Sequence, residues 1–159
     1  MKPKPFQPQP LQATPNHVRN ASDGKVWHRC NYRVLYADTD RSQVVYHANY
    51  LRYFEMGRAS LMREAGYPYK DVEASGFVYP IIEIGVNYYS ALEYDDAVWI
   101  YTCPGLMERV RLQFDYVITH ARSGETVCIG FTRHCATNSA GVPVAIDAMT
   151  LKLWQNFPK

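Results

Sequence analysis

The sequence predicts an α+β domain in which one long helix is buried against an antiparallel β-sheet. Residues 49–65 carry apolar side chains at the spacing of one helix face. The segments that follow residue 77 are rich in β-branched and aromatic residues, and turn-forming residues separate them. A helix with one apolar face needs another layer of structure to cover it, and this order of elements supplies a sheet.

The helix is expected to run from Asn49 to Ala65, about 17 residues that contain no proline. Apolar or small residues recur at positions 50, 54, 57, 61 and 65 and form one face. The side-chain oxygen of Asn49 is expected to cap the free amides of the first turn. Gly66 and Pro68 end the helix. At the usual rise it is ~25 Å long, enough to cross a five-stranded sheet.

The remaining elements follow from alternation and from turn residues. The clearest strand lies at residues 110–120, where apolar side chains from Val110 to Ile118 alternate with mostly polar ones. Pro80 suggests an edge position or a bulge near the start of residues 77–89. The full set comprises strands at residues 26–36, 77–89, 97–103, 110–120 and 126–137, a short helical turn at 70–75, a loop at 138–143 and a short C-terminal helix anchored by Trp154.

Residues 1–24 differ from the rest of the chain in composition. They hold five of the ten prolines and three glutamines. Such a segment buries too little surface to offset the conformational entropy that it loses on folding. We therefore expect residues 1–24 to form a disordered Pro/Gln-rich N-terminal arm and residues 25–159 to form a single domain.

Composition argues against several classes of protein. A net charge of +2 without a run of Lys/Arg argues against a nucleic-acid partner. No apolar stretch approaches the ~20 residues of a membrane span, and no apolar run follows the N-terminal lysines as in a signal peptide. A cytoplasmic location is expected. Four cysteines without CxxC spacing favour reduced thiols: Cys30, Cys103, Cys128 and Cys135.

The stretch YADTDRSQVVYHANYLRYFE, residues 36–55, combines two aspartates, a histidine and an asparagine. Asp38 and Asp40 match the first two ligand positions of a calcium loop. Gln43 and Asn49 stand where that loop needs a glycine and a bidentate glutamate, so a metal site is not expected. Two alternatives remain: a turn in which the aspartates bond their own backbone, and a reaction site at a helix start.

The second alternative rests on the positions of Asp40 and His47 beside the predicted helix start. Amides at a helix N-terminus attract a developing anion, and a carboxylate beside them could activate water or attack an acyl carbon itself. A serine hydrolase would need a GxSxG motif, which the chain lacks. Cys30 and Cys103 have no nearby histidine that would indicate a thiol nucleophile.

The same stretch resembles the signature of the 4-hydroxybenzoyl-CoA thioesterase family: Asp-x-Asp, several turn residues, then Val-Val-Tyr-His-Ala-Asn-Tyr. Within that family it is most similar to the acyl-CoA thioesterases of the bacterial Tol–Pal group. The resemblance extends more loosely from about Val26 to Trp154. It implies the hotdog fold, a curved antiparallel β-sheet wrapped around one long central α-helix. It also implies hydrolysis of acyl-CoA thioesters by a homo-oligomer, a dimer or a tetramer, with the active site at the dimer interface.

Carried over residue by residue, the resemblance assigns Asp40 as the catalytic carboxylate. His47 and Tyr36 match further catalytic residues of the family. Tyr46 and Asn49 are expected to shape the substrate pocket or the helix cap.

The chain departs from the family directly after Asp40. Relatives often have small residues there, frequently glycine, whereas this chain has Arg41-Ser42-Gln43. The shape of the turn and the width of the acyl pocket therefore stay open, and Asp38 is left as a turn former. Four basic residues could bind the phosphates of CoA or lie on a solvated strand face, and they are not assigned: Arg109, Arg111, Arg133 and Lys152.

We expect an acyl-CoA thioesterase that uses Asp40 as nucleophile or general base and needs no metal and no other cofactor. The alternative is a non-catalytic hotdog module that binds acyl-CoA or acyl-carrier-protein thioesters without cleaving them. A hotdog dehydratase would need a different histidine and acid constellation, which the sequence does not show. The acyl chain length and the preference for aryl or alkyl groups stay open.

Overall fold

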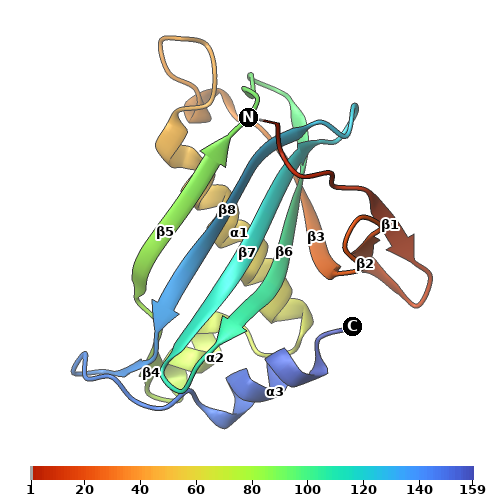
Figure 1. Ribbon diagram of the computed structural model, residues 1–159. Coiled ribbons are helices and arrows are strands. Elements are labelled where there is room, and N and C mark those ends of the chain that lie inside the picture. The colour runs from red at the N-terminus through yellow and green to blue at the C-terminus, as the bar shows by residue number, and fades with distance from the viewer. Residues whose placement is uncertain (1) are drawn as a thin grey trace.

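A single long helix, α1 (Tyr50–Glu64), lies across one face of a seven-stranded antiparallel sheet in the computed structural model, which describes residues 2–159 (Figure 1). The strand order is β1-β2-β3-β6-β7-β8-β5, and β4 and β9 form a small second sheet. Helices α2 (Tyr69–Ala74) and α3 (Ala148–Asn156) lie near the C-terminal end of α1. The strands are β1 (Pro8–Leu11), β2 (Thr14–Asn20), β3 (Val26–Arg33), β4 (Phe77–Val78), β5 (Ile81–Tyr88), β6 (Ala97–Met107), β7 (Arg111–His120), β8 (Thr126–Cys135) and β9 (Thr137–Asn138).

The apolar face of α1 packs directly on the middle of the sheet. The ring of Phe54 stacks on that of Tyr116, with the ring centroids 4.3 Å apart. Gly57 brings the helix close to β6, because a Cβ atom there would lie 2.4 Å from the Thr102 hydroxyl. Phe54, Leu61 and Tyr116 all belong to the main core. The predicted α+β class and the hotdog arrangement of one helix on a curved antiparallel sheet are therefore confirmed.

Most predicted elements are present, and two differ at a proline. The strand expected at residues 77–89 is divided at Pro80 into β4 and β5. The strand expected to end at Cys103 continues to Met107, because a register shift between Pro104 and Met107 lets β6 absorb the proline without ending. Trp154 anchors the predicted C-terminal helix, since its indole N–H donates to the Gly105 carbonyl at 3.0 Å.

The expected disorder of residues 1–24 is wrong for residues 8–20. These residues form β1 and β2, and β2 pairs with β3 and extends the sheet. The physical reason is a second apolar cluster on the sheet face opposite α1. Val18 on β2 is fully buried there, and Phe6 packs its ring against Trp27 and Tyr101 at centroid distances of 5.6 and 4.7 Å.

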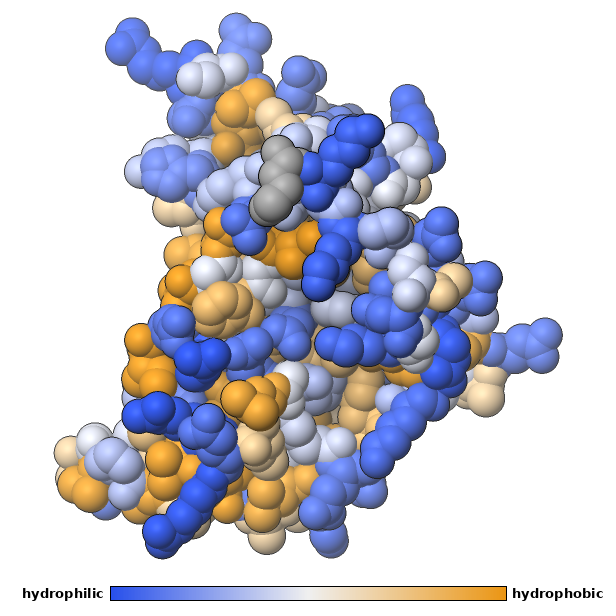
Figure 2. Space-filling view, viewed as in Figure 1, coloured by the Kyte–Doolittle hydropathy of each residue, from blue (hydrophilic) through white to orange (hydrophobic). Residues whose placement is uncertain are grey.

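Strand β5 forms the edge of the sheet furthest from the N-terminal hairpin and is largely uncovered. Several of its apolar side chains are exposed, among them Ile82 at 50% and Ile84 at 41%. Figure 2 shows apolar side chains along this flank, on the left of the view. Among residues 2–159, no helix combines the length and apolar character needed to cross a membrane.

Candidate active site

The signature stretch folds into a loop that leads into α1. A short 3-10 turn, Tyr36–Asp38, opens the loop, and a second one, His47–Asn49, runs into the helix. Between them, Thr39 and Val45 pair as an isolated antiparallel bridge. This pairing holds the two aspartates on one side of the loop and the His47 segment on the other.

Asp38 is buried and fully engaged. Only 1% of the residue is exposed. Its Oδ2 atom accepts hydrogen bonds from the hydroxyls of Tyr32 and Tyr53, at 2.8 and 3.0 Å, and from the amide of Leu35 at 2.9 Å. Its Oδ1 atom lies 3.7 Å from the guanidinium of Arg52. A carboxylate held in this way organises the loop and is not free to react.

The two tyrosines are fixed as donors to Asp38. Burial, reinforced by the hydrogen bond to Asp38, raises the pKa of Tyr32 to about 12. The same causes, with burial again the largest, raise the pKa of Tyr53 further. Both phenols therefore stay protonated at neutral pH and keep donating to Asp38. Asp38 is accordingly an anchor that joins β3, the loop and α1.

Asp40 is exposed, and its contacts are few. Its Oδ1 atom accepts from the Ser42 amide at 2.7 Å, and its backbone closes a tight turn with Val44 and Gln43. No ion pair reaches its carboxylate from any of residues 2–159. Gln43 occupies the left-handed region with φ of 64°, a conformation that favours glycine. The turn after Asp40 therefore carries some backbone strain.

The other predicted site residues lie on the same loop, and among residues 2–159 none of them forms a side-chain hydrogen bond or an ion pair with Asp40. The ring of Tyr36 is 77% exposed and packs edge-on against Tyr94. The ring of His47 packs on that of Tyr46 at 4.4 Å, and the Tyr88 hydroxyl on β5 donates to the His47 carbonyl at 2.6 Å. Within residues 2–159, no hydrogen bond or ion pair joins Asp40 to His47.

Asn49 does not cap the helix as expected. Its side-chain amide donates to the backbone carbonyl of Asp38 at 2.8 Å. Asn49 already has helical backbone angles, because the His47–Asn49 turn precedes α1, so its side chain does not fold back over the first-turn amides. Asn49 therefore pins the aspartate side of the loop to the helix start.

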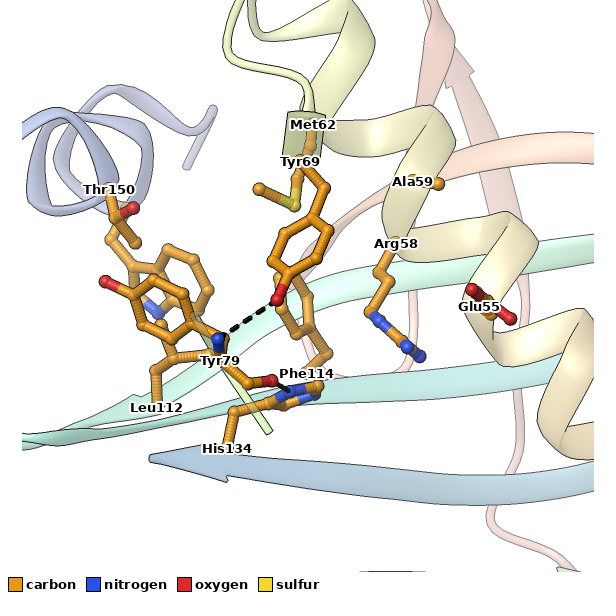
Figure 3. A pocket seen from close by; sticks show the side chains of 11 residues that line it. Glu55, Arg58, Ala59, Met62, Tyr69, Tyr79, Leu112, Phe114, His134 and Thr150 are labelled. Atoms are coloured by element: carbon orange, nitrogen blue, oxygen red, sulfur yellow. Dashed lines mark hydrogen bonds between the residues drawn. The ribbon is translucent and has the colours of Figure 1, made fainter. Parts of the chain in front are cut away.

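A cavity of about 130 Å³ lies along the C-terminal half of α1, and the sequence analysis missed it (Figure 3). Arg58 projects into it from α1, and His134 forms part of its wall on β8. One sequence signal could have identified Arg58. It lies four residues after Phe54 and three before Leu61, so a charge sits beside the buried stripe of the helix.

A serine, a histidine and a glutamate also line up between α1 and β3. The Nε2 atom of His28 lies 2.9 Å from the Ser60 hydroxyl, and its Nδ1 atom lies 3.0 Å from the carboxylate of Glu64. The order matches that of a catalytic triad. However, only 1% of His28 is exposed, and the cluster sits at the contact between helix and sheet. We interpret it as an anchor of α1 on β3.

Comparisons with known proteins agree with the fold and with the signature stretch. The profile of the thioesterase-like superfamily matches residues 34–152. The chain is 39% identical over 69 residues to a putative acyl-CoA thioesterase, YneP, of Bacillus subtilis, a match that covers 43% of this chain and 50% of that protein. It is 31% identical over 91 residues to the acyl-CoA thioester hydrolase YbgC of Escherichia coli O6:H1, which covers 57% of this chain and 68% of that protein.

Among solved structures, the fold is shared with a mutant of 4-hydroxybenzoyl-CoA thioesterase in complex with 4-hydroxybenzoyl-CoA. The TM-score is 0.72 at 18% identity, over 80% of this chain and 97% of that one. The Bacillus match spans only half the length of that relative.

Proposed function

The chain belongs to the thioesterase-like superfamily, and on that basis we propose that it hydrolyses acyl-CoA thioesters to a free acid and CoA. The names of the curated relatives support this activity. The observation that carries the residue assignment is the contrast between two aspartates in one loop. The carboxylate of Asp38 accepts three hydrogen bonds that hold the loop together, whereas that of Asp40 is exposed and accepts one, from a backbone amide.

In the proposed reaction, Asp40 acts on the thioester carbonyl in one of two ways. As a general base it takes a proton from water, and the water oxygen attacks the carbonyl carbon. As a nucleophile its carboxylate attacks that carbon itself, and water then cleaves the resulting anhydride. Either way the C–S bond breaks and the proton passes to the CoA thiolate, so no metal or other cofactor is required.

His47 and Tyr36 are proposed to contact the thioester from the same loop. The imidazole of His47 is exposed and could donate to the developing oxyanion. The phenol of Tyr36 is free to reach a substrate, since most of its surface is uncovered. Tyr46 is proposed to position the His47 ring, which it contacts, and Asn49 to hold the loop against α1.

A second copy of the chain is proposed to complete the site. Strand β5 has a free edge and exposed isoleucines, so two copies can pair through it and continue the sheet. A two-fold axis at the middle of an antiparallel β5 pair reverses one copy relative to the other. The Asp40 loop of one subunit would then face the C-terminal half of the other subunit's α1, where the cavity lies.

A cytoplasmic location belongs to the same proposal. All four cysteines are free thiols, as expected in a reducing compartment.

The second candidate function is the hotdog module that binds a thioester without cleaving it. Among residues 2–159, Asp40 and His47 are not joined by a hydrogen bond or an ion pair, which favours this candidate, so activity has to be measured directly.

The deciding experiment compares wild-type protein with Asp40→Asn. Release of free thiol from a panel of acyl-CoA substrates measures hydrolysis, and calorimetry measures substrate binding. We expect hydrolysis by the wild type and a loss of at least ~10²-fold in kcat for Asp40→Asn, with binding retained. Equal rates for the two proteins would exclude Asp40 as the catalytic group. Binding without hydrolysis by either protein would support the binding module.

A further inference from the structure

The cavity beside α1 contains a cation, Arg58, that forms no ion pair with any of residues 2–159. The cavity is lined by side chains from α1, α2, β7, β8 and α3 and by Tyr79. Most of these are apolar or aromatic, among them Met62, Leu112 and Phe114. Arg58 brings a guanidinium to this apolar surface (Figure 3). Arg58 is half-buried, and a charge partly withdrawn from water is stabilised by an acceptor buried beside it.

The polar groups at the inner end of the cavity are already satisfied within the chain. His134 is bonded at both ring nitrogens, through Nδ1 to the Tyr79 carbonyl at 2.9 Å and through Nε2 to the Thr132 hydroxyl at 2.8 Å. The Tyr69 hydroxyl accepts from the Tyr79 amide, and the Thr150 hydroxyl donates to Asp147. These groups form a fixed wall and offer little to a ligand.

Arg58 and Glu55 are the exceptions among the polar side chains of the lining. Within residues 2–159, Arg58 makes no ion pair, and no carboxylate oxygen lies within 4.0 Å of its guanidinium nitrogens, Glu55 included. Burial raises the pKa of Tyr116, whereas the charge of Arg58 and a side-chain hydrogen bond between the two residues act in the opposite sense. The phenol of Tyr116 is neutral, so it does not balance the charge of Arg58. Glu55 is exposed, which places it at the open end of the cavity.

The size of the cavity limits what it can hold. A volume of about 130 Å³ is slightly smaller than a ~150 Å³ apolar cavity that is known to accept benzene. One six-membered ring or a short alkyl chain would therefore fill it, whereas a long fatty acyl chain would not fit.

We propose that this cavity is the acyl pocket and that Arg58 selects acyl groups, no larger than about one ring, that carry a negatively charged or hydrogen-bond-accepting oxygen. The proposal rests on the thioesterase function proposed above. A carboxylate or phenolic oxygen at the far end of the acyl group would supply a strong acceptor for the Arg58 guanidinium, which has no carboxylate partner among residues 2–159. A charge-assisted hydrogen bond of this kind corresponds to a preference of roughly 10- to 100-fold over an acyl group without the oxygen.

Two matched pairs of substrates test the selectivity and separate the two sources of oxygen. One pair is glutaryl-CoA and pentanoyl-CoA, and the other is 4-hydroxybenzoyl-CoA and benzoyl-CoA. For wild-type protein we expect kcat/KM to favour the oxygen-bearing member of at least one pair by ~10-fold or more. Palmitoyl-CoA should be a poor substrate because of its size. A wild-type preference for palmitoyl-CoA, or ratios near one for both pairs, would overturn the proposal.

Variants of Arg58 assign the preference to this residue. Arg58→Met should bring the ratio close to one, because kcat/KM should fall further for the oxygen-bearing member of each pair than for its partner. Arg58→Lys keeps the charge but not the planar fork, so it should keep part of the preference. Glu55→Gln is the matched control and should keep all of it. Two results would show that Arg58 does not determine the selectivity for the acyl group. One is an unchanged ratio in Arg58→Met, and the other is an equal fall of the ratio in Glu55→Gln.

The proposal can fail independently of the thioesterase function. If the wild type hydrolyses no thioester, the same ratios are measured as Kd by calorimetry, with the same expected dependence on Arg58. If Arg58→Met unfolds at a lower temperature and hydrolyses neither member of a pair, the kcat/KM ratio of the pair is measured in Arg58→Lys instead. A reduced preference in that folded variant supports the role of the guanidinium, and an unaltered preference refutes it.

Discussion

Replacement of Asp38 by asparagine should destabilise the fold, although the change removes no heavy atom. Three donors converge on one oxygen of this buried carboxylate: the hydroxyls of Tyr32 and Tyr53 and the amide of Leu35. Asparagine can still accept at that position, but each bond loses its charge assistance, which is worth about 1 kcal/mol. The total is ~3 kcal/mol, and for a chain of this length it corresponds to a fall of roughly 6–12 °C in Tm.

Thermal denaturation followed by circular dichroism measures this effect, and two variants serve as controls. Asp40→Asn replaces an exposed aspartate with one backbone contact and should shift Tm by less than ~2 °C. Tyr53→Phe removes one of the three donors and should have an intermediate effect. In a double-mutant cycle, Asp38→Asn and Tyr53→Phe should be less than additive, because they break the same bond. A Tm for Asp38→Asn within ~2 °C of wild type would refute the assignment of Asp38 as the anchor of the loop.

Three further predictions address the hairpin, the sheet edge and pH. Deletion of residues 1–24 should lower Tm by several degrees, because it uncovers Trp27 and removes the Phe6 contact; an unchanged Tm would mean that the hairpin adds no stability. Ile84→Lys at the middle of β5 should convert a dimer to a monomer in light scattering, and a dimer that survives would place the interface elsewhere. Burial lowers the pKa of His134 to about 4 from 6.5, so the unfolded chain binds a proton there that the folded chain does not. Stability should therefore fall by up to ~3 kcal/mol as pH drops from 6.5 to 4 in denaturant titrations, and His134→Gln should flatten that part of the profile.

The features that local pattern predicted are those whose cause is local. Alternation identified β7, and the helix spacing placed α1 to within one residue at each end. Gly66 takes the left-handed conformation with φ of 82°, as expected for a residue that follows a helix. The family resemblance likewise rests on a contiguous stretch, which is why the superfamily and the hotdog fold were predictable.

What the sequence did not reveal depends on partners that are distant along the chain. Whether Phe6 and Val18 are buried depends on an apolar cluster of the opposite sheet face, which proline content does not report. The division of roles between the two aspartates depends on Tyr32 and Tyr53, which come from β3 and α1. The roles of Asp40, His47 and Tyr36 in catalysis stay predictions, because they rest on the family signature.

The prolines of β1 have a consequence for how the sheet can grow. Gln7 accepts from the Ala21 amide, so the odd-numbered residues of this segment turn their backbone groups towards β2. Pro8 and Pro10 then lie on the outer side, where neither has an amide to offer a further strand. The outer side of β1 thus lacks amide donors at both positions and offers only carbonyl acceptors, while β5 keeps its donors. A sheet with one edge weakened in this way favours a closed pair through β5 over continued growth into a filament.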